Sequence, residues 1–280
     1  MLNNFKIYPK IDYTLYSKEF ETEIENAEGV EIQLFNGDEH TVDIDIKERL
    51  KLVLDRYPNL KEITIHPPLY NYDIEQIVIR DERIIKRQLK DIIELSDKYN
   101  IKVHMLYHTN WTIKQHIATG LIDKIKDYLK ILEGHDSYMF IENLFMFEEE
   151  TCSALEIAKY IDHPNLKVCI DTTHLYCKAN IYKTNIMEFL NKYLDKEMCE
   201  KYVYQIHFAK ALDNDGYIRI ETHGRVHESN ETLDYDLRWM KDYNLLDKNF
   251  VVEVSEDDYR LRTDQLKEIL MLREEIKKYM

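Results

Sequence analysis

Short apolar runs alternate with helical segments along the whole chain, and this alternation restricts the fold more than any other feature. Eight runs have the length and the β-branched or aromatic content of strands. They are Phe5–Tyr8, Val30–Phe35, Glu62–His66, Ile101–His108, Tyr138–Glu142, Leu166–Asp171, Tyr202–His207 and Phe250–Val254. The segments between them space their apolar residues as an amphipathic helix does. Such segments are Asp81–Tyr99, Ile113–Leu132, Leu155–Ile161, Ile186–Tyr193, Leu233–Tyr243 and Leu261–Tyr279, with a weakly patterned one at Leu15–Ala27.

Helical crossovers between strands make neighbouring strands parallel. Eight strands in 280 residues therefore predict an eight-stranded (β/α)8 TIM barrel, with residues 1–280 as a single domain. No stretch rich in proline, glycine or serine divides the chain. A doubly wound sheet is the rival, but it would place a glycine-rich phosphate loop after the first strand, and Tyr8–Tyr13 contains no glycine.

The charge balance and the cysteines limit the classes of protein to which the chain can belong. The chain has 53 acidic and 38 basic residues, a formal charge of −15, which disfavours a bulk attraction to nucleic acid or to an anionic membrane. Its four cysteines show no paired spacing, which favours a reducing cytoplasmic setting. No apolar run is long enough for a membrane span or a signal peptide. We therefore expect a soluble protein; the sequence leaves its oligomeric state open.

Polar residues that can bind metal stand where the strands end. Because alternate residues of a strand face opposite sides, Thr64 and His66 face into the barrel while Ile63 and Ile65 face the helices. The same parity applied to the other strands predicts that six residues converge on one mouth of the barrel: His66, His108, Glu142, Asp171, His207 and Glu253. His174, on the loop after Asp171, and Glu221 and His223, in the loop after the seventh strand, complete a set of nine.

Nine imidazole and carboxylate ligands exceed what one metal ion takes. We therefore expect two to three divalent transition ions per chain, with zinc first and manganese or iron as alternatives. Other polar residues are less informative. We expect His104 to lie in the core and His40, His116, His135 and His163 on the surface; residues that could line a pocket are His227, Trp111, Tyr70, Tyr72, Tyr107 and Tyr176.

The order and spacing of these ligands resemble those of the xylose-isomerase-like barrels and, within them, the endonuclease IV family of apurinic-site endonucleases. The resemblance implies one metal on His66, His108 and Glu142, a second on Glu142, Asp171, His207 and Glu253, and a third on His174, Glu221 and His223. Glu221 stands where the family has aspartate. The segments after Glu142, His207 and His223 also depart from the family, which contacts its substrate with them.

Two functions from different classes follow. The first is a metal-dependent hydrolase of phosphodiester bonds, acting on damaged DNA or a smaller phosphodiester, in which Glu142 bridges two metals and His174 helps to hold the third, beside the leaving oxygen. The second is a sugar or sugar-phosphate isomerase or epimerase, in which one divalent ion polarises the substrate while Glu142 and Glu253 move protons. A barrel kept only for binding ranks last, because none of the nine ligands is missing.

Overall fold

A computed structural model describes residues 6–12, 15–34, 45–66, 73–144, 152–214, 217–226, 230–254, 256 and 260–280, without the side chains of 211–222 and 230–232. Eight parallel strands close into a barrel in the order β1-β10-β7-β6-β5-β4-β3-β2. The strands are β1 (Lys6–Ile11), β2 (Gly29–Gln33), β3 (Glu62–His66), β4 (Lys102–Thr109), β5 (Met139–Asn143), β6 (Leu166–Asp171), β7 (Val203–Phe208) and β10 (Asn249–Val252). All eight predicted strands are present, which confirms the TIM barrel.

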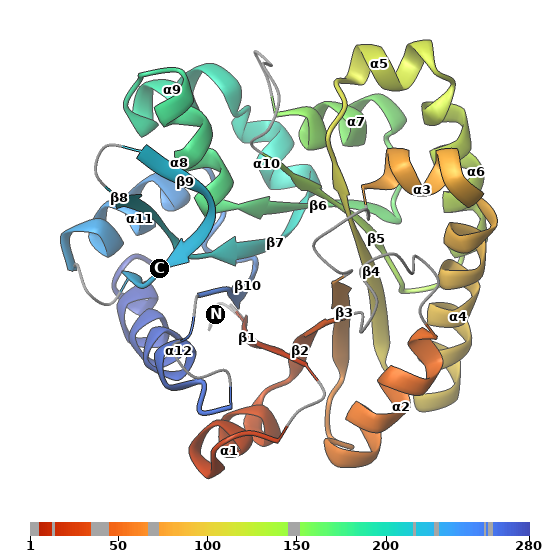
Figure 1. Cartoon of the computed structure of the whole chain (residues 1–280), viewed down its shortest axis with the longest axis horizontal. Helices are drawn as coiled ribbons and strands as arrows, with labels where there is room; N and C mark the ends of the chain where they lie inside the picture. Colours follow the sequence, from red (N-terminus) through yellow and green to blue (C-terminus); the bar gives the residue numbers. More distant parts are fainter. Residues whose placement is uncertain are drawn as a thin grey trace.

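Helices surround the ring of strands (Figure 1). They are α1 (Lys18–Asn26), α2 (Ile46–Arg56), α3 (Ile74–Asp81), α4 (Arg83–Tyr99), α5 (Ile113–Ala118), α6 (Leu121–Leu132), α7 (Ser153–Ile161), α8 (Thr172–Ile181), α9 (Ile186–Tyr193), α10 (Lys196–Tyr202), α11 (Asn230–Asp242) and α12 (Thr263–Glu275). The single helix expected over Ile113–Leu132 is wrong. Gly120, with φ of 72°, divides it into α5 and α6, because a left-handed residue cannot continue a helix.

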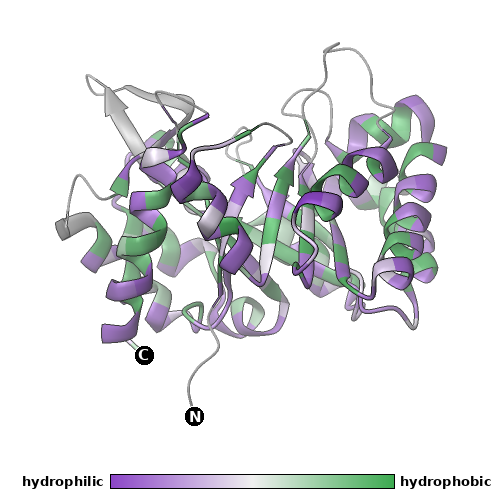
Figure 2. Cartoon of the chain, turned by 90° about the horizontal axis from the view of Figure 1, so that it is seen from below, coloured by the Kyte–Doolittle hydropathy of each residue, from purple (hydrophilic) through white to green (hydrophobic). Residues whose placement is uncertain are grey.

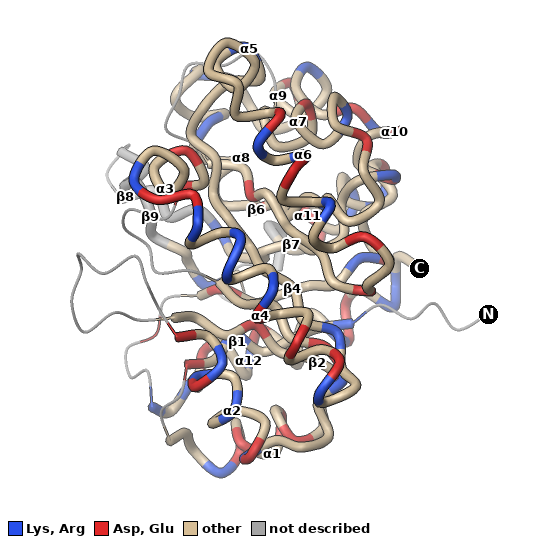
Figure 3. The backbone as a smooth tube through the Cα atoms, turned by 90° about the vertical axis from the view of Figure 1, so that its right-hand side faces the viewer, with Lys and Arg blue, Asp and Glu red and all other residues tan. Residues whose placement is uncertain are grey.

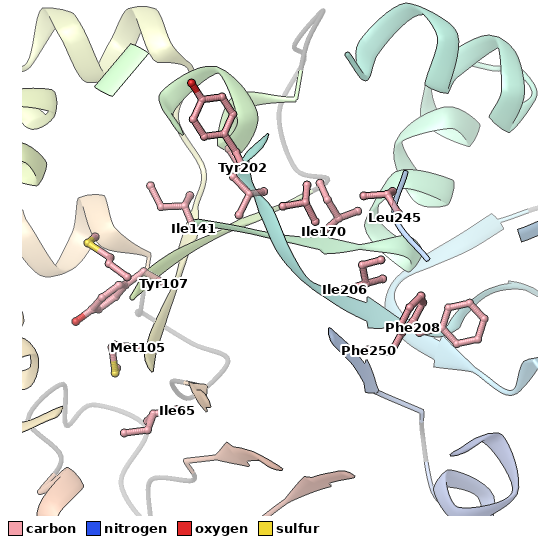
Figure 4. Close-up of a cluster of buried hydrophobic side chains, with 14 of the residues drawn as sticks. Ile65, Met105, Tyr107, Ile141, Ile170, Tyr202, Ile206, Phe208, Leu245 and Phe250 are labelled. Atoms are coloured by element: carbon pink, nitrogen blue, oxygen red, sulfur yellow. The ribbon is translucent and has the colours of Figure 1, made fainter. Parts of the chain in front are cut away.

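The apolar core lies between the barrel and its helices. Outward-facing strand residues such as Ile65, Ile141 and Ile206 contribute to it (Figure 4). Tyr107, expected as a pocket residue, also faces this core, where its hydroxyl donates a hydrogen bond to Gln88 over 2.9 Å. Polar residues concentrate on the outer sides of the helices (Figure 2). None of the described helices combines the length and apolar character needed to cross a bilayer.

The barrel interior is layered. Leu106, Phe140 and Cys169 form a small apolar layer in its middle. Below it, at the amino-terminal ends of the strands, Glu62 accepts hydrogen bonds from the hydroxyls of Tyr8 and Tyr204, each over 2.9 Å. Because a packed middle layer and a polar layer fill this end, a substrate could reach the interior only from the carboxyl ends of the strands.

An antiparallel hairpin follows β7. It consists of β8 (Lys210–Asn214) and β9 (Tyr217–Gly224), paired from Lys210 with Gly224 to Asn214 with Tyr217. The expectation that Glu221 and His223 lie in a loop is therefore wrong, since both belong to β9. His223 thus reaches the barrel mouth from an extended strand.

Candidate metal centre

The six residues predicted at the strand ends do converge at one mouth. His66 ends β3, His108 and Glu142 lie near the ends of β4 and β5, and Asp171 ends β6. His207 lies near the end of β7, and Glu253 follows the last residue of β10. All except Glu253 are buried, and the side chain of Glu253 is only 15% exposed. Since parallel strands of a closed barrel end at the same side, their carboxyl-terminal residues share one site.

Glu142 lies at the centre of this site. Its Oε2 atom lies 3.7 Å from Nε2 of His66 and 3.3 Å from Nε2 of His108. Its Oε1 atom lies 3.6 Å from Nδ1 of His174 and 3.4 Å from Nδ1 of His207. Each oxygen of the carboxylate therefore faces its own pair of histidines.

A second group forms where β6 passes into α8. Oδ1 of Asp171 accepts the backbone N–H of His174 over 2.9 Å and so caps α8, while Oδ2 lies 3.1 Å from Nε2 of His223. The expectation of a loop at His174 is wrong, because this cap starts the helix directly after the strand. Nδ1 of His174 lies 2.7 Å from the carbonyl oxygen of Asn143. If Nδ1–H donates to that oxygen, Nε2 keeps a lone pair for a metal.

Glu31, which the sequence analysis missed, orients His207. Its Oε2 atom lies 2.8 Å from Nε2 of His207 and accepts a hydrogen bond from Gln205 over 2.7 Å. An imidazole whose Nε2 faces a carboxylate presents Nδ1 to the other side, here towards Glu142 and Glu253. Glu31 has the inward parity of Val30–Phe35, so the strand pattern contains the signal, but Glu31 lies inside the apolar run and not at its end, where the other predicted ligands lie.

Lys10 is the second residue that the sequence analysis missed. Its ammonium lies 2.6 Å from Oε1 of Glu253 and 3.0 Å from Oε1 of Glu31, and its side chain is 7% exposed. Burial lowers the pKa of Lys10, but the carboxylates of Glu253 and Glu31 outweigh burial and raise the pKa above its usual value. The site therefore contains a fixed positive charge.

The histidines beside Glu142 differ in their electrostatics. Burial and the charge of Lys10 lower the pKa of His66 to about 3, so this imidazole is neutral at pH 7. Burial also lowers the pKa of His108, but the charge of Glu142 outweighs it and leaves the pKa raised. Burial alone would raise the pKa of Glu142, yet His207 and His108 hold that pKa well below 4.5. Glu142 is thus ionised, as a metal ligand must be.

The ligand atoms fit a divalent transition ion. Two groups that share no residue have their ligand atoms within 4.8 Å of one another: His66, His108 and Glu142, and Asp171, His174 and His223. Buried imidazole nitrogens and carboxylate oxygens also face one another closely: Nε2 of His108 and Oε2 of Glu142 lie 3.3 Å apart, and Nδ1 of His207 and Oε2 of Glu253 lie 2.9 Å apart. Nitrogen and oxygen ligands that converge in this way suit a common cation.

The expected second and third ligand sets are only partly assembled. Asp171 groups with His174 and His223, and its Oδ2 lies 4.0 Å from Nδ1 of His207. Glu253 groups instead with Glu31, His66 and His207. Glu221 lies on β9, but its side chain is outside the described residues, as are the pocket candidates His227, Tyr70 and Tyr72 and the predicted surface residue His40.

A buried network supports His108 from behind. Glu75 accepts hydrogen bonds from the Thr109 hydroxyl over 2.5 Å and from the backbone N–H of Trp111 over 3.2 Å, and it lies 3.1 Å from Nε2 of His116. The surface position expected for His116 is therefore wrong, because this acid in α3 gives the imidazole a buried partner. The network holds the chain that follows His108 at the end of β4.

Comparison with solved structures finds the same fold at low sequence identity. The chain is similar to a D-tagatose 3-epimerase-like protein, with 19% identity, a TM-score of 0.56 and coverage of 98% of this chain and 97% of that one. It is similar to endonuclease IV from Thermus thermophilus, with 14% identity, a TM-score of 0.56 and coverage of 98% of both chains. A third similar structure is the IOLI protein with a bound zinc atom, with 13% identity, a TM-score of 0.58 and coverage of 99% of both chains.

The comparison with curated proteins found no match. A family model described as "Xylose isomerase-like TIM barrel" matches residues 24–275, which is most of the chain, and this confirms the resemblance seen in the ligand order. The chain therefore belongs to the xylose isomerase-like TIM barrel family.

Proposed function

We propose that this chain is a metal-dependent hydrolase of phosphodiester bonds, similar in its chemistry to endonuclease IV. One observation carries the proposal: the two oxygens of Glu142 face separate pairs of histidines. A carboxylate in that position can join two metal ions, and paired ions are typical of enzymes that displace an oxygen at phosphorus. An isomerase that needs one ion does not require His66 and His108 as metal ligands.

Bound divalent ions would supply a water of lowered pKa, near 7, and positive charge for a phosphate. The residues of the chain contribute position and charge. Glu142, His66 and His108 would hold the first ion, and Asp171, His174 (through Nε2) and His223 would hold the second. The other oxygen of Glu142, beside His207, could contribute to the second ion. Glu31 would keep His207 turned towards them. We expect zinc as the resident ion, with manganese or iron as alternatives.

A second candidate, a sugar or sugar-phosphate isomerase or epimerase, is supported by a different contact. Nδ1 of His207 lies 2.9 Å from Oε2 of Glu253 and 3.4 Å from Oε1 of Glu142. Two carboxylates on one imidazole could share a single ion and move protons on either side of a hydroxy-ketone. One similar solved structure is described as a D-tagatose 3-epimerase-like protein, which supports this second candidate.

The test combines metal content with activity for the wild type, His66→Ala and His108→Ala. The control is His135→Ala, which removes a partly exposed histidine that precedes β5 at the opposite end of the barrel. Metal is counted on protein purified without chelator, and activity is assayed on an abasic-site oligonucleotide and on a panel of ketoses. The hydrolase proposal expects at least two ions in the wild type and in the control. Both site variants should lose one ion and more than about 100-fold in cleavage, since even outer partners of metal ligands are worth 10–100-fold.

The outcome that rejects the hydrolase is equally specific. Both site variants would keep the full metal content, and the wild type would convert a ketose without cleaving a phosphodiester. That result would favour the isomerase, in which His66 and His108 only line the pocket.

A further inference from the structure

We propose that Lys10 is a resident cation that limits the cluster to two divalent ions, because its ammonium lies against both Glu31 and Glu253 and would repel a third ion at these carboxylates. This inference deepens the proposed function and rests on it for the count of two ions in the wild type. The change in the count on removing Lys10 does not depend on the reaction.

The described ligand atoms offer room for more than two ions. Besides the group of His66, His108 and Glu142 and that of Asp171, His174 and His223, a further group brings Glu31, His66, His207 and Glu253 within 4.8 Å of one another. It shares His66 with the first group, so Glu31, His207 and Glu253 are the ligands that it has to itself. Two carboxylates and one imidazole are an ordinary set of three protein ligands for zinc or manganese. On ligand chemistry alone, this third group would hold an ion.

Lys10 already pairs with both carboxylates of that group. Its Nζ atom lies 3.0 Å from Oε1 of Glu31 and 2.6 Å from Oε1 of Glu253. The Oε2 atoms of the same two carboxylates face His207, so an ion bound to them would lie beside the ammonium, a like charge in a buried site. The single charge of the Lys10 ammonium therefore neutralises carboxylates that would otherwise attract a divalent ion.

The backbone fixes Lys10 in this position. Lys10 is the register partner of Glu31 in the pairing of β1 with β2. On its other side, Pro9 pairs with Val252, so the residues that follow them, Lys10 and Glu253, are also neighbours. Only 7% of the Lys10 side chain is exposed. The ammonium therefore lies between two strands that both direct a carboxylate at it, and it has little freedom to leave.

The charge of the cluster agrees with two ions. The carboxylates of Glu31, Glu142, Asp171 and Glu253 together with Lys10 carry a net charge of −3. Two divalent ions would bring the described cluster to +1, and three would bring it to +3. A site that binds a phosphodiester needs a positive charge, and the smaller excess costs less in a buried pocket.

A fourth combination of ligands, Glu142, Cys169 and His207, is unsuited to an ion. It reuses Glu142, which the first group already contains, and His207, which lies beside Glu31 and Glu253. Cys169 also belongs to the apolar layer in the middle of the barrel. The group beside Lys10 is therefore the place to test for a third ion.

The experiment counts zinc by mass spectrometry after the folded protein is equilibrated with the ion and desalted. Lys10→Met removes the charge and keeps a similar length. We expect two ions per chain in the wild type and three in Lys10→Met. Lys10→Arg, which keeps the charge, should stay at two. Lys6→Met is the matched control, because Lys6 lies on the same strand and pairs with Glu62 and Glu28 at the opposite mouth; it should also stay at two.

Three ions in the wild type, or two in folded Lys10→Met, would overturn the inference. Lys10→Met could fail to fold because two carboxylates lose their partner. In that case Lys10→Gln replaces it, since an amide can donate a hydrogen bond to Glu253 without carrying a charge. Two ions in Lys10→Gln would also overturn the inference. A gain of one ion without any phosphodiesterase activity would reject the proposed function and keep this inference. A wild type that cleaves phosphodiesters and holds three ions would support the proposed function and reject this inference.

Discussion

Nε2 of His223 lies 3.1 Å from Oδ2 of Asp171, although 52 residues separate them in the chain. The hairpin of β8 and β9 makes this contact possible by carrying His223 back over the end of β6. We predict that His223→Ala removes one ion, because it breaks the group of Asp171 and His174 and leaves that of His66 and His108 intact. Metal counts on His223→Ala, His66→Ala and the double variant should show separate, additive losses. Loss of both ions in either single variant would contradict two independent groups.

The ligands at the strand ends could be predicted from the sequence. The charged residues inside the barrel that pair with them could not. His66 and Asp171 each close an apolar run, so their position at the mouth follows from the strand itself. Lys10 and Glu253 are 243 residues apart, and only closure of the barrel makes β1 and β10 neighbours. A charged residue inside an apolar run does not by itself indicate which other strand will supply its ion-pair partner.

Two local elements were missed for different reasons. Helix α8 has no polar stripe because seven of its ten residues are buried, so its sequence lacks the periodicity of a surface helix. The hairpin had a signal, since Asp215 and Gly216 stand between two runs of alternating polarity, and this dipeptide favours tight turns. The expectation of a loop at Glu221 and His223 disregards this signal.

Gly29 at the start of β2 provides a test of packing. A Cβ atom at this position would lie 2.7 Å from the carbonyl oxygen of Glu62 and 2.7 Å from Cζ of Tyr8. We predict that Gly29→Ala destabilises the fold by about 1–3 kcal/mol, because both the neighbouring backbone and a buried ring must move. Chemical denaturation measures the change. Gly120→Ala is the comparison: its Cβ would meet nothing within 4 Å, but its φ of 72° adds strain of about 1–2 kcal/mol. A Gly29→Ala variant as stable as the wild type would contradict the predicted clash.

Glu62 should make the free energy of unfolding depend on pH in the acidic range. Burial raises its pKa, but His104, Tyr8 and Lys6 outweigh burial and lower the pKa to about 2. A carboxyl whose pKa is depressed in the folded state stabilises it above the unfolded pKa, and this contribution is lost as the pH falls from about 4.5 towards 2. We predict that Glu62→Gln lowers the free energy of unfolding at pH 7 by up to ~3 kcal/mol, and by less than about half of that amount at pH 3. Denaturation at several pH values checks this, and metal content should not change.

Asp236 should have the opposite effect. Its Oδ1 accepts hydrogen bonds from Tyr176 and from Trp239, but burial outweighs them and raises its pKa to about 6. The folded state then binds a proton that the unfolded chain has released, so stability falls as the pH rises from about 4 to 6 and stays lower above that. We predict that Asp236→Asn flattens this part of the stability profile. An unchanged slope between pH 4 and 6 would show that the carboxyl titrates normally in the folded protein.

Binding to undamaged duplex DNA should be weak and should depend little on salt. The chain carries −15, and two divalent ions would leave it near −11. Basic and acidic residues are interspersed over the helices in Figure 3, without a continuous basic face on that side. Each phosphate contact by lysine or arginine adds about 0.9 to the slope of log affinity against log salt, so we expect a slope below about 2 in magnitude. Metal-depleted protein and the wild type are compared on an intact and an abasic duplex between low and moderate salt. Tight binding of the intact duplex with a steep slope would mean that a basic surface, and not the metal centre, recognises DNA.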